Sequence, residues 1–168
     1  KGLWHHACGA GWGIAEDCCK WNPAISCNGA GQVVGLNLRG CGIQGELGKL
    51  LNIPTLVNVS LDNNSLVGPL VPAGGTVASS LQSLSAYGNS LSGVLDSLAA
   101  ATSLVTLDLH FNDFTAGLFF ANNLIYLVYL SLANYRLTGA IPQQWKSLTK
   151  LSTLGLAYNG LSGNLTVL

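Results

Sequence analysis

Residues 104–114 read Leu-Val-Thr-Leu-Asp-Leu-His-Phe-Asn-Asp-Phe, with leucines alternating with other residues ahead of a single asparagine. This alternation is typical of a short strand that buries one face. Asn112 ends the strand, where its amide can bond backbone groups that would otherwise be buried without partners. One such strand cannot bury its leucines alone. The stretch therefore predicts a unit that stacks against copies of itself.

The same pattern recurs along the chain, giving six copies. Their spacing, L-x-x-L-x-L-x-x-N/C-x-L, is that of the leucine-rich repeat. We expect an α/β repeat solenoid over residues 33–168, with short parallel β-strands on the concave face and irregular or 3-10 segments on the convex side. The last repeat is expected to be incomplete, without a C-terminal cap. At steps of 23, 25, 23, 23 and 24 residues, the central apolar position is occupied by Leu36, Val59, Leu84, Leu107, Leu130 and Leu154.

The position after each strand predicts a ladder of asparagines that bond the backbone of neighbouring turns. Cys41 occupies this position in the first copy and Tyr135 in the fifth. We therefore expect a local break in the ladder at Tyr135. The expected ladder consists of Asn64, Asn89, Asn112 and Asn159.

Four copies continue after this position as x-L-x-G-x-L, and residues 137–142 add Ile141-Pro142. This continuation resembles the plant-specific subclass of leucine-rich repeats, whose consensus reads L-x-G-x-I-P. The resemblance implies a second short strand beside the main sheet. Residues 72–80, which contain Gly74-Gly75, lengthen one repeat and are expected to bulge on the convex side.

Residues 1–32 carry no repeat and are expected to form the cap that seals the first repeat. One stretch begins at Trp12 and contains Asp-Cys-Cys-Lys-Trp at residues 17–21. This stretch closely resembles the cap that precedes plant-type repeats. That resemblance implies the disulfides Cys8–Cys18 and Cys19–Cys27, one of three pairings open to four cysteines. Cys41 is left over, and we expect a buried cysteine in the asparagine position.

Paired cysteines indicate an oxidising compartment, and we expect an extracellular or cell-surface location. The chain starts at Lys1 without Met or a hydrophobic leader, consistent with removal of a signal peptide. Three N-glycosylation sequons agree with secretion. They begin at Asn58, Asn63 and Asn164.

Composition excludes several classes of protein. The chain is 49% hydrophobic and 8% charged, with seven Lys and Arg against seven Asp and Glu. The absence of a basic excess argues against nucleic-acid binding. The longest apolar stretch, 118–133, is too short and too polar for a membrane span.

The outward positions of the strands form columns on the concave face, and aromatic residues gather in its later half. Tyrosine is common at binding hot spots, so this patch is the best candidate for ligand binding. A solvated face with scattered aromatics remains the alternative. The candidate residues are Tyr87, Asp108, His110, Phe111, Tyr129 and Tyr158.

Catalysis is not expected. Asp108 and His110 share a side, flanked by Ser85 and Ser131. However, a flat open face lacks the pocket and oxyanion donors of a hydrolase. The motif His5-His6-x-Cys8 does not amount to a metal site, because Cys8 is expected to be oxidised. We expect no metal and no cofactor.

Two functions remain. The chain resembles receptor-kinase ectodomains and secreted polygalacturonase inhibitors of plants, which implies recognition of a protein, peptide or cell-wall glycan. The alternative is a structural surface or matrix glycoprotein whose partners are copies of itself, since low net charge promotes association. The end at Leu168 inside a repeat favours a fragment of a longer protein.

Overall fold

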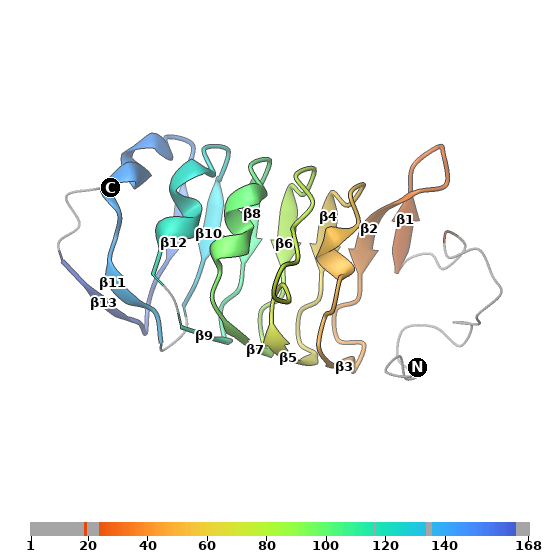
Figure 1. Cartoon of the computed structure of the whole chain (residues 1–168), viewed down its shortest axis with the longest axis horizontal. Helices are drawn as coiled ribbons and strands as arrows, with labels where there is room; N and C mark the ends of the chain where they lie inside the picture. The colour runs from red at the N-terminus through yellow and green to blue at the C-terminus, as the bar shows by residue number, and fades with distance from the viewer. Residues whose placement is uncertain (1–18, 20–23, 116, 134–135, 164–168) are drawn as a thin grey trace.

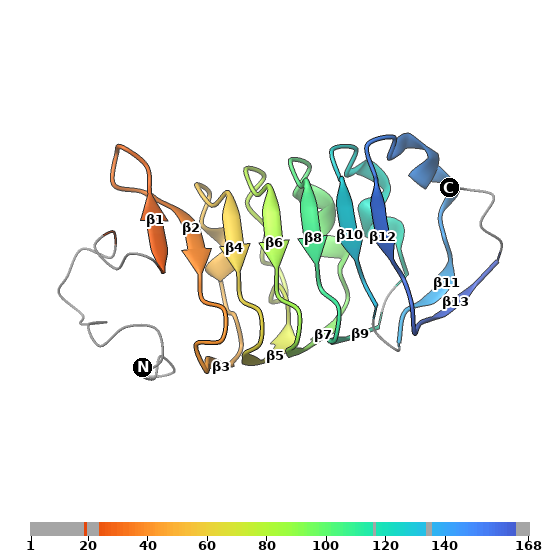
Figure 2. The same ribbon diagram turned by 180° about the vertical axis from the view of Figure 1, so that it is seen from behind.

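A computed structural model describes Cys19 and residues 24–115, 117–133 and 136–163 of the chain. The described residues form a solenoid whose turns stack side by side (Figure 1). One long sheet lies along one side and short helices lie along the other, as the reverse view shows (Figure 2). This arrangement confirms the predicted leucine-rich-repeat solenoid.

The main sheet has seven strands in the order β1-β2-β4-β6-β8-β10-β12. Six of them pair in parallel and in register, so that Leu84 faces Val59 on one side and Leu107 on the other. β1, from the N-terminal segment, pairs with β2 in the antiparallel sense. The strands are β1 (Ile25–Cys27), β2 (Val33–Asn37), β4 (Asn58–Ser60), β6 (Ser83–Ser85), β8 (Thr106–Asp108), β10 (Tyr129–Ser131) and β12 (Thr153–Gly155).

The second strand of each plant-type repeat is also present. These strands form a four-stranded sheet, β3-β5-β7-β9, and a two-stranded sheet, β11-β13, along one edge of the solenoid (Figure 1). The strands are β3 (Gln44–Gly45), β5 (Ser65–Pro69), β7 (Ser90–Gly93), β9 (Asp113–Phe114), β11 (Thr138–Ala140) and β13 (Gly160–Ser162).

Short 3-10 helices lie on the side of the solenoid opposite the main sheet (Figure 1). In the described chain, the lengthened stretch 72–80 forms turns and irregular backbone where neighbouring repeats place a helix. The helices are η2 (Leu50–Asn52), η3 (Asp96–Ala100), η4 (Phe119–Asn123) and η5 (Gln143–Ser147).

The core runs through the interior of the stack. Leu84, Leu107 and Leu130 are completely buried because a repeat packs on each side of them. Leu154, in the last described repeat, is only partly buried. The inward leucines thus stabilise each turn only where the next turn covers them, as expected for a solenoid.

Asparagines bond the turns to one another. The Asn112 Oδ1 atom accepts a hydrogen bond from the Leu91 N–H at 2.9 Å. Its Nδ2 donates to the carbonyls of Ala86 and Leu109 at 2.9 and 3.0 Å. In other repeats, the same pair of bonds, with Oδ1 accepting from a backbone N–H and Nδ2 donating to a carbonyl of the preceding turn, is made by Asn64, Asn89 and Asn159. The break expected at Tyr135 lies outside the described residues.

Cys19 and Cys27 form a disulfide, as predicted. Cys41 is buried, as expected, but it is also disulfide-bonded, so the expectation of a left-over thiol was wrong. The reason lies in its place in the stack. Cys41 belongs to the first repeat, whose neighbour in the main sheet is the antiparallel strand β1 and not a repeat turn of the kind that Asn64 bonds through the Leu38 carbonyl. The expected Cys8–Cys18 pair lies outside the described residues.

Candidate ligand-binding face

The outward surface of the main sheet, here called the sheet face, is the face that the sequence predicts as concave. Parallel in-register pairing places equivalent positions of successive repeats in columns across it. Tyr87 and His110 occupy one column, in the turns that follow β6 and β8. Side chains far apart in sequence are therefore neighbours on this face.

Three rings pack together in these turns and form what we call the aromatic cluster, made of Tyr87, His110 and Phe111. The imidazole of His110 stacks on the Tyr87 ring, with centroids 4.6 Å apart and an interplanar angle of 9°. Phe111 meets the imidazole edge-on, with centroids 4.9 Å apart. Both are favoured aromatic geometries, so the cluster holds its shape without a ligand.

Asp108, the last residue of β8, holds the imidazole of His110 in place. Its Oδ1 lies 2.5 Å from His110 Nδ1, and its Oδ2 accepts a hydrogen bond from the Tyr129 hydroxyl at 3.3 Å. The His110 side chain remains 23% exposed, which leaves its far edge open to a ligand.

Arg39 and Asn63 support the cluster from the preceding repeats. The Arg39 guanidinium carbon lies 5.4 Å from the centroid of the Tyr87 ring, within cation–π range. Asn63 Nδ2 donates to the Tyr87 hydroxyl at 3.2 Å. The binding candidates from the sequence omitted both residues, although Arg39 shares a column with Tyr87 and Asn63, predicted only as a glycosylation site, shares one with Phe111.

Phe111 and Tyr158 adopt the left-handed backbone region, with φ of 54° and 58°. Their position in the repeat requires this conformation, since Gly40, Asn63 and Gly88 also have positive φ there. Glycine and asparagine tolerate it, whereas a bulky residue there is strained by about 1–2 kcal/mol. Phe111 and Tyr158 are nevertheless 58% and 67% exposed. Core packing therefore does not explain these two aromatic residues.

The structure brings five of the six predicted binding residues into one connected group. These five are Tyr87, Asp108, His110, Phe111 and Tyr129. Tyr158 shares the column of Phe111 but lies two repeats further along the sheet face.

The two serines that flank Asp108 and His110 are engaged elsewhere. The Ser85 hydroxyl donates to Asp62, and Ser131 is buried. Within the described ranges, neither serine makes a hydrogen bond to His110. The contact between nucleophile and base on which a serine triad depends is therefore not formed here.

Two of the three predicted glycosylation sites can be placed. Asn58 lies on β4 and Asn63 in the turn after it, and both are exposed. Asn164 lies outside the described residues. The part of the chain that the structure describes contains no cluster of His, Cys, Asp and Glu able to hold a metal ion, and no helix there is long and apolar enough to cross a membrane.

The curated relatives of the chain are plant receptor kinases. It is 32% identical to the serine/threonine-protein kinase BRI1-like 1 of Arabidopsis thaliana over 164 residues, which are 96% of this chain and 12% of that protein. It is 31% identical to the receptor-like kinase TMK2 of the same plant over 156 residues, 87% of this chain and 17% of that one. The chain thus spans less than a fifth of the length of these relatives. No family model matches it.

Solved structures agree with these relatives. The leucine-rich-repeat ectodomain of the receptor kinase GASSHO1/SCHENGEN3 from Arabidopsis thaliana, in complex with CASPARIAN STRIP INTEGRITY FACTOR 2, superposes with a TM-score of 0.78. Sequence identity is 32%, and the match covers 85% of this chain and 18% of that one. The chain is a plant-type leucine-rich-repeat protein.

Two further structures show how widely this fold is used. The Arabidopsis receptor kinase HAESA, in complex with the peptide hormone IDA and the co-receptor SERK1, gives a TM-score of 0.58 at 27% identity over 90% of this chain and 34% of that one. A plant ice-binding protein gives 0.71 at 25% identity over 89% of this chain and 50% of that one. The repeat scaffold alone therefore does not select a function.

Proposed function

We propose that the chain is a non-enzymatic extracellular recognition domain that binds a protein or peptide partner through the aromatic cluster and Tyr158. The observation that carries the proposal is Phe111. It is an exposed aromatic residue held in a strained backbone conformation and packed into a preformed cluster. The repeat requires a left-handed residue at this position but not a bulky one, and a strained bulky residue there is characteristic of functional sites.

The chemistry of the cluster suits a protein or peptide. Tyrosine and other rigid aromatics supply contact area at low entropic cost, and they are frequent at binding hot spots. Since only 8% of the residues are charged, the contacts would be aromatic and hydrogen-bonded. Binding should accordingly change little with ionic strength.

The similar proteins support this assignment. HAESA holds a peptide hormone, and the GASSHO1/SCHENGEN3 ectodomain holds CASPARIAN STRIP INTEGRITY FACTOR 2. Their receptor character and the Cys19–Cys27 disulfide both favour an extracellular location for this chain.

A displayed library of random peptides tests the proposal. Peptides enriched on the chain should bind at least tenfold more weakly to Phe111→Ala and Tyr158→Ala variants. Val94→Ala is the matched control, because Val94 is 57% exposed and follows β7, away from the sheet face. Enriched peptides that bind all variants equally would remove the aromatic cluster as the site.

Self-assembly is the second candidate, favoured by the low charge of the surface. Size-exclusion chromatography with light scattering over a hundredfold range of concentration separates the two. A mass that rises with concentration, and returns to the monomer in the Phe111→Ala variant, would make a second copy of the chain the partner. A constant monomer mass would eliminate assembly.

A further inference from the structure

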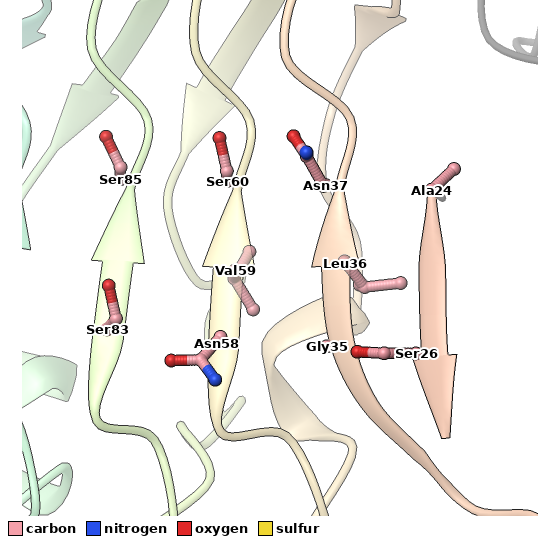
Figure 3. A pocket seen from close by; sticks show the side chains of 10 residues that line it. All are labelled: Ala24, Ser26, Gly35, Leu36, Asn37, Asn58, Val59, Ser60, Ser83 and Ser85. Atoms are coloured by element: carbon pink, nitrogen blue, oxygen red, sulfur yellow. The ribbon is translucent and has the colours of Figure 1, made fainter. Parts of the chain in front are cut away.

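A second feature of the sheet face lies in its first half, away from the aromatic cluster. It is a hollow of about 210 Å³ over β1, β2, β4 and β6 (Figure 3). That volume corresponds to about seven water molecules at their liquid volume, enough for one ring-sized group. Its lining residues are Ala24, Ser26, Gly35, Leu36, Asn37, Asn58, Val59, Ser60, Ser83 and Ser85.

Six of the ten lining residues carry a hydroxyl or amide group, and none of the ten is charged. Figure 3 shows Asn37, Ser60 and Ser85 at one level of their strands and Ser26, Asn58 and Ser83 at the other. Such groups both donate and accept hydrogen bonds. A neutral ligand with many hydroxyl groups would form hydrogen bonds with these side chains. A charged ligand would lose hydration on entering the hollow, and no opposite charge in the lining would compensate for that loss.

A buried carboxyl group behind the hollow orients two of its hydroxyls. Asp62 is only 4% exposed. It accepts hydrogen bonds from the Ser85 and Ser60 hydroxyls at 2.5 and 3.2 Å, and from the Tyr87 N–H at 3.2 Å. The hydrogens of both hydroxyls are therefore directed at Asp62, which is not among the lining residues. The lone pairs of both hydroxyls remain available to accept from a ligand.

Other polar side chains of the lining are not engaged by the protein. Among the residues that the structure describes, the side chains of Asn37, Asn58 and Ser83 make no hydrogen bond. They can supply the donors that Ser60 and Ser85 lack. Leu36 and Val59, between the two polar levels, are core residues with only 7% and 2% exposure, so contacts to a ring come from the polar side chains.

Gly35 keeps the N-terminal side of the hollow open. A Cβ at this position would lie 2.2 Å from the Ser26 Oγ atom, so any other residue would displace the Ser26 side chain. β1 thereby forms a wall of the hollow as well as the edge of the sheet.

From these observations we infer that the hollow binds a neutral sugar ring, with Ser60 and Ser85 accepting from its hydroxyls and Asp62 acting as the positioning residue. The ring has two sources, a free saccharide or an N-glycan on Asn58, the sequon asparagine that itself lines the hollow. None of the residues that line the hollow belongs to the aromatic cluster, although Asp62 also accepts from the Tyr87 N–H, and the inference does not rest on peptide binding to the cluster.

The first experiment uses the full chain from a host that does not N-glycosylate. Saturation-transfer NMR and titration calorimetry are run with cellotetraose, xylotetraose and mannotetraose, and with tetragalacturonic acid as the anionic comparison. At least one neutral saccharide should bind. Ser83→Ala and Asp62→Asn should each weaken it about tenfold, the effect of one lost hydrogen bond.

The controls separate this site from general effects. Ser90→Ala, an exposed serine on β7, and Phe111→Ala should leave saccharide affinity unchanged. Circular dichroism of Asp62→Asn shows whether this variant is folded. If it is not, the test rests on Ser83→Ala, which breaks no hydrogen bond within the described ranges. Equal or tighter binding of tetragalacturonic acid, or unchanged affinity in both hollow variants, would overturn the inference.

The second experiment uses the chain from a glycosylating host. If Asn58 is the source, glycopeptide mapping finds it occupied, and NOEs connect the first sugar ring with the β-protons of Ser83, the residue beside Asn58 on the next strand. In that case free saccharides bind only to the unglycosylated chain. Absence of saccharide binding in the first experiment and of these NOEs in the second would leave no sugar site in the hollow.

Discussion

The rings of Tyr87 and His110 lie face to face at 4.6 Å although the residues are 23 positions apart and belong to neighbouring repeats. The stack follows from the in-register pairing of β6 with β8, which puts both residues in one column. Asp108 holds the imidazole from below and Asn63 holds the tyrosine hydroxyl. The cluster is therefore preorganised, and ligand binding does not have to include the entropic cost of ordering its side chains.

This stack should contribute to stability as well as to binding. In a double-mutant cycle with Tyr87→Ala and His110→Ala, we expect a coupling free energy of about 0.5–1.5 kcal/mol, as for other aromatic pairs. Urea unfolding followed by circular dichroism measures it. Tyr87→Ala paired with Tyr158→Ala, residues several repeats apart, should be additive. Additivity for Tyr87 and His110 as well would show that the stack contributes no net free energy.

Sequence alone determines the scaffold because burial forces it. The central leucine of each copy, such as Leu84 or Leu107, must face inward. The spacing of these leucines therefore defines the strands and the register. The register in turn predicts that Tyr87 and His110 are neighbours. The left-handed backbone of Phe111 could have been predicted too, because Gly40, Asn63 and Gly88 occupy its position in earlier repeats.

Other features depend on geometry that spacing does not encode. Asp62 occupies an outward column, yet it is buried because the Ser60 and Ser85 hydroxyls and the Tyr87 N–H surround its carboxyl group. These contacts depend on side-chain rotamers. The disulfide of Cys41 is likewise a contact that the spacing of the leucines does not describe.

Loss of one ladder asparagine should destabilise the whole stack. Asn112→Ala removes the partner of the Leu91 N–H and of the Leu109 carbonyl inside the core. We expect a loss of about 2–4 kcal/mol in the free energy of unfolding, the range for buried groups left unsatisfied. Asn123→Ala, at an exposed position of η4, serves as control and should change it by less than about 0.5 kcal/mol. Similar urea midpoints for the two variants would contradict the ladder's structural role.

The disulfides can be checked directly. Peptide mapping of the non-reduced chain should recover a Cys19–Cys27 link and a second link that contains Cys41. With five cysteines in the chain, thiol titration under denaturing conditions should find one free thiol. A Cys8–Cys18 link would leave Cys41 without a partner in its own chain, and its recovery would contradict the bonding of Cys41 described above.

Phe111 should lower the stability of the fold while increasing its affinity for a ligand. Asparagine tolerates the left-handed region, so Phe111→Asn relieves strain, although it also loses the edge contact with His110. We expect a net gain of about 0.5–1 kcal/mol in the free energy of unfolding, part of the roughly 1–2 kcal/mol cost of a left-handed residue. Phe111→Ala keeps the strained backbone and should show no gain. Both variants should lose at least tenfold in affinity for peptides selected on the original chain. A variant that becomes more stable and binds as well as before would show that the strained phenylalanine has no role in recognition.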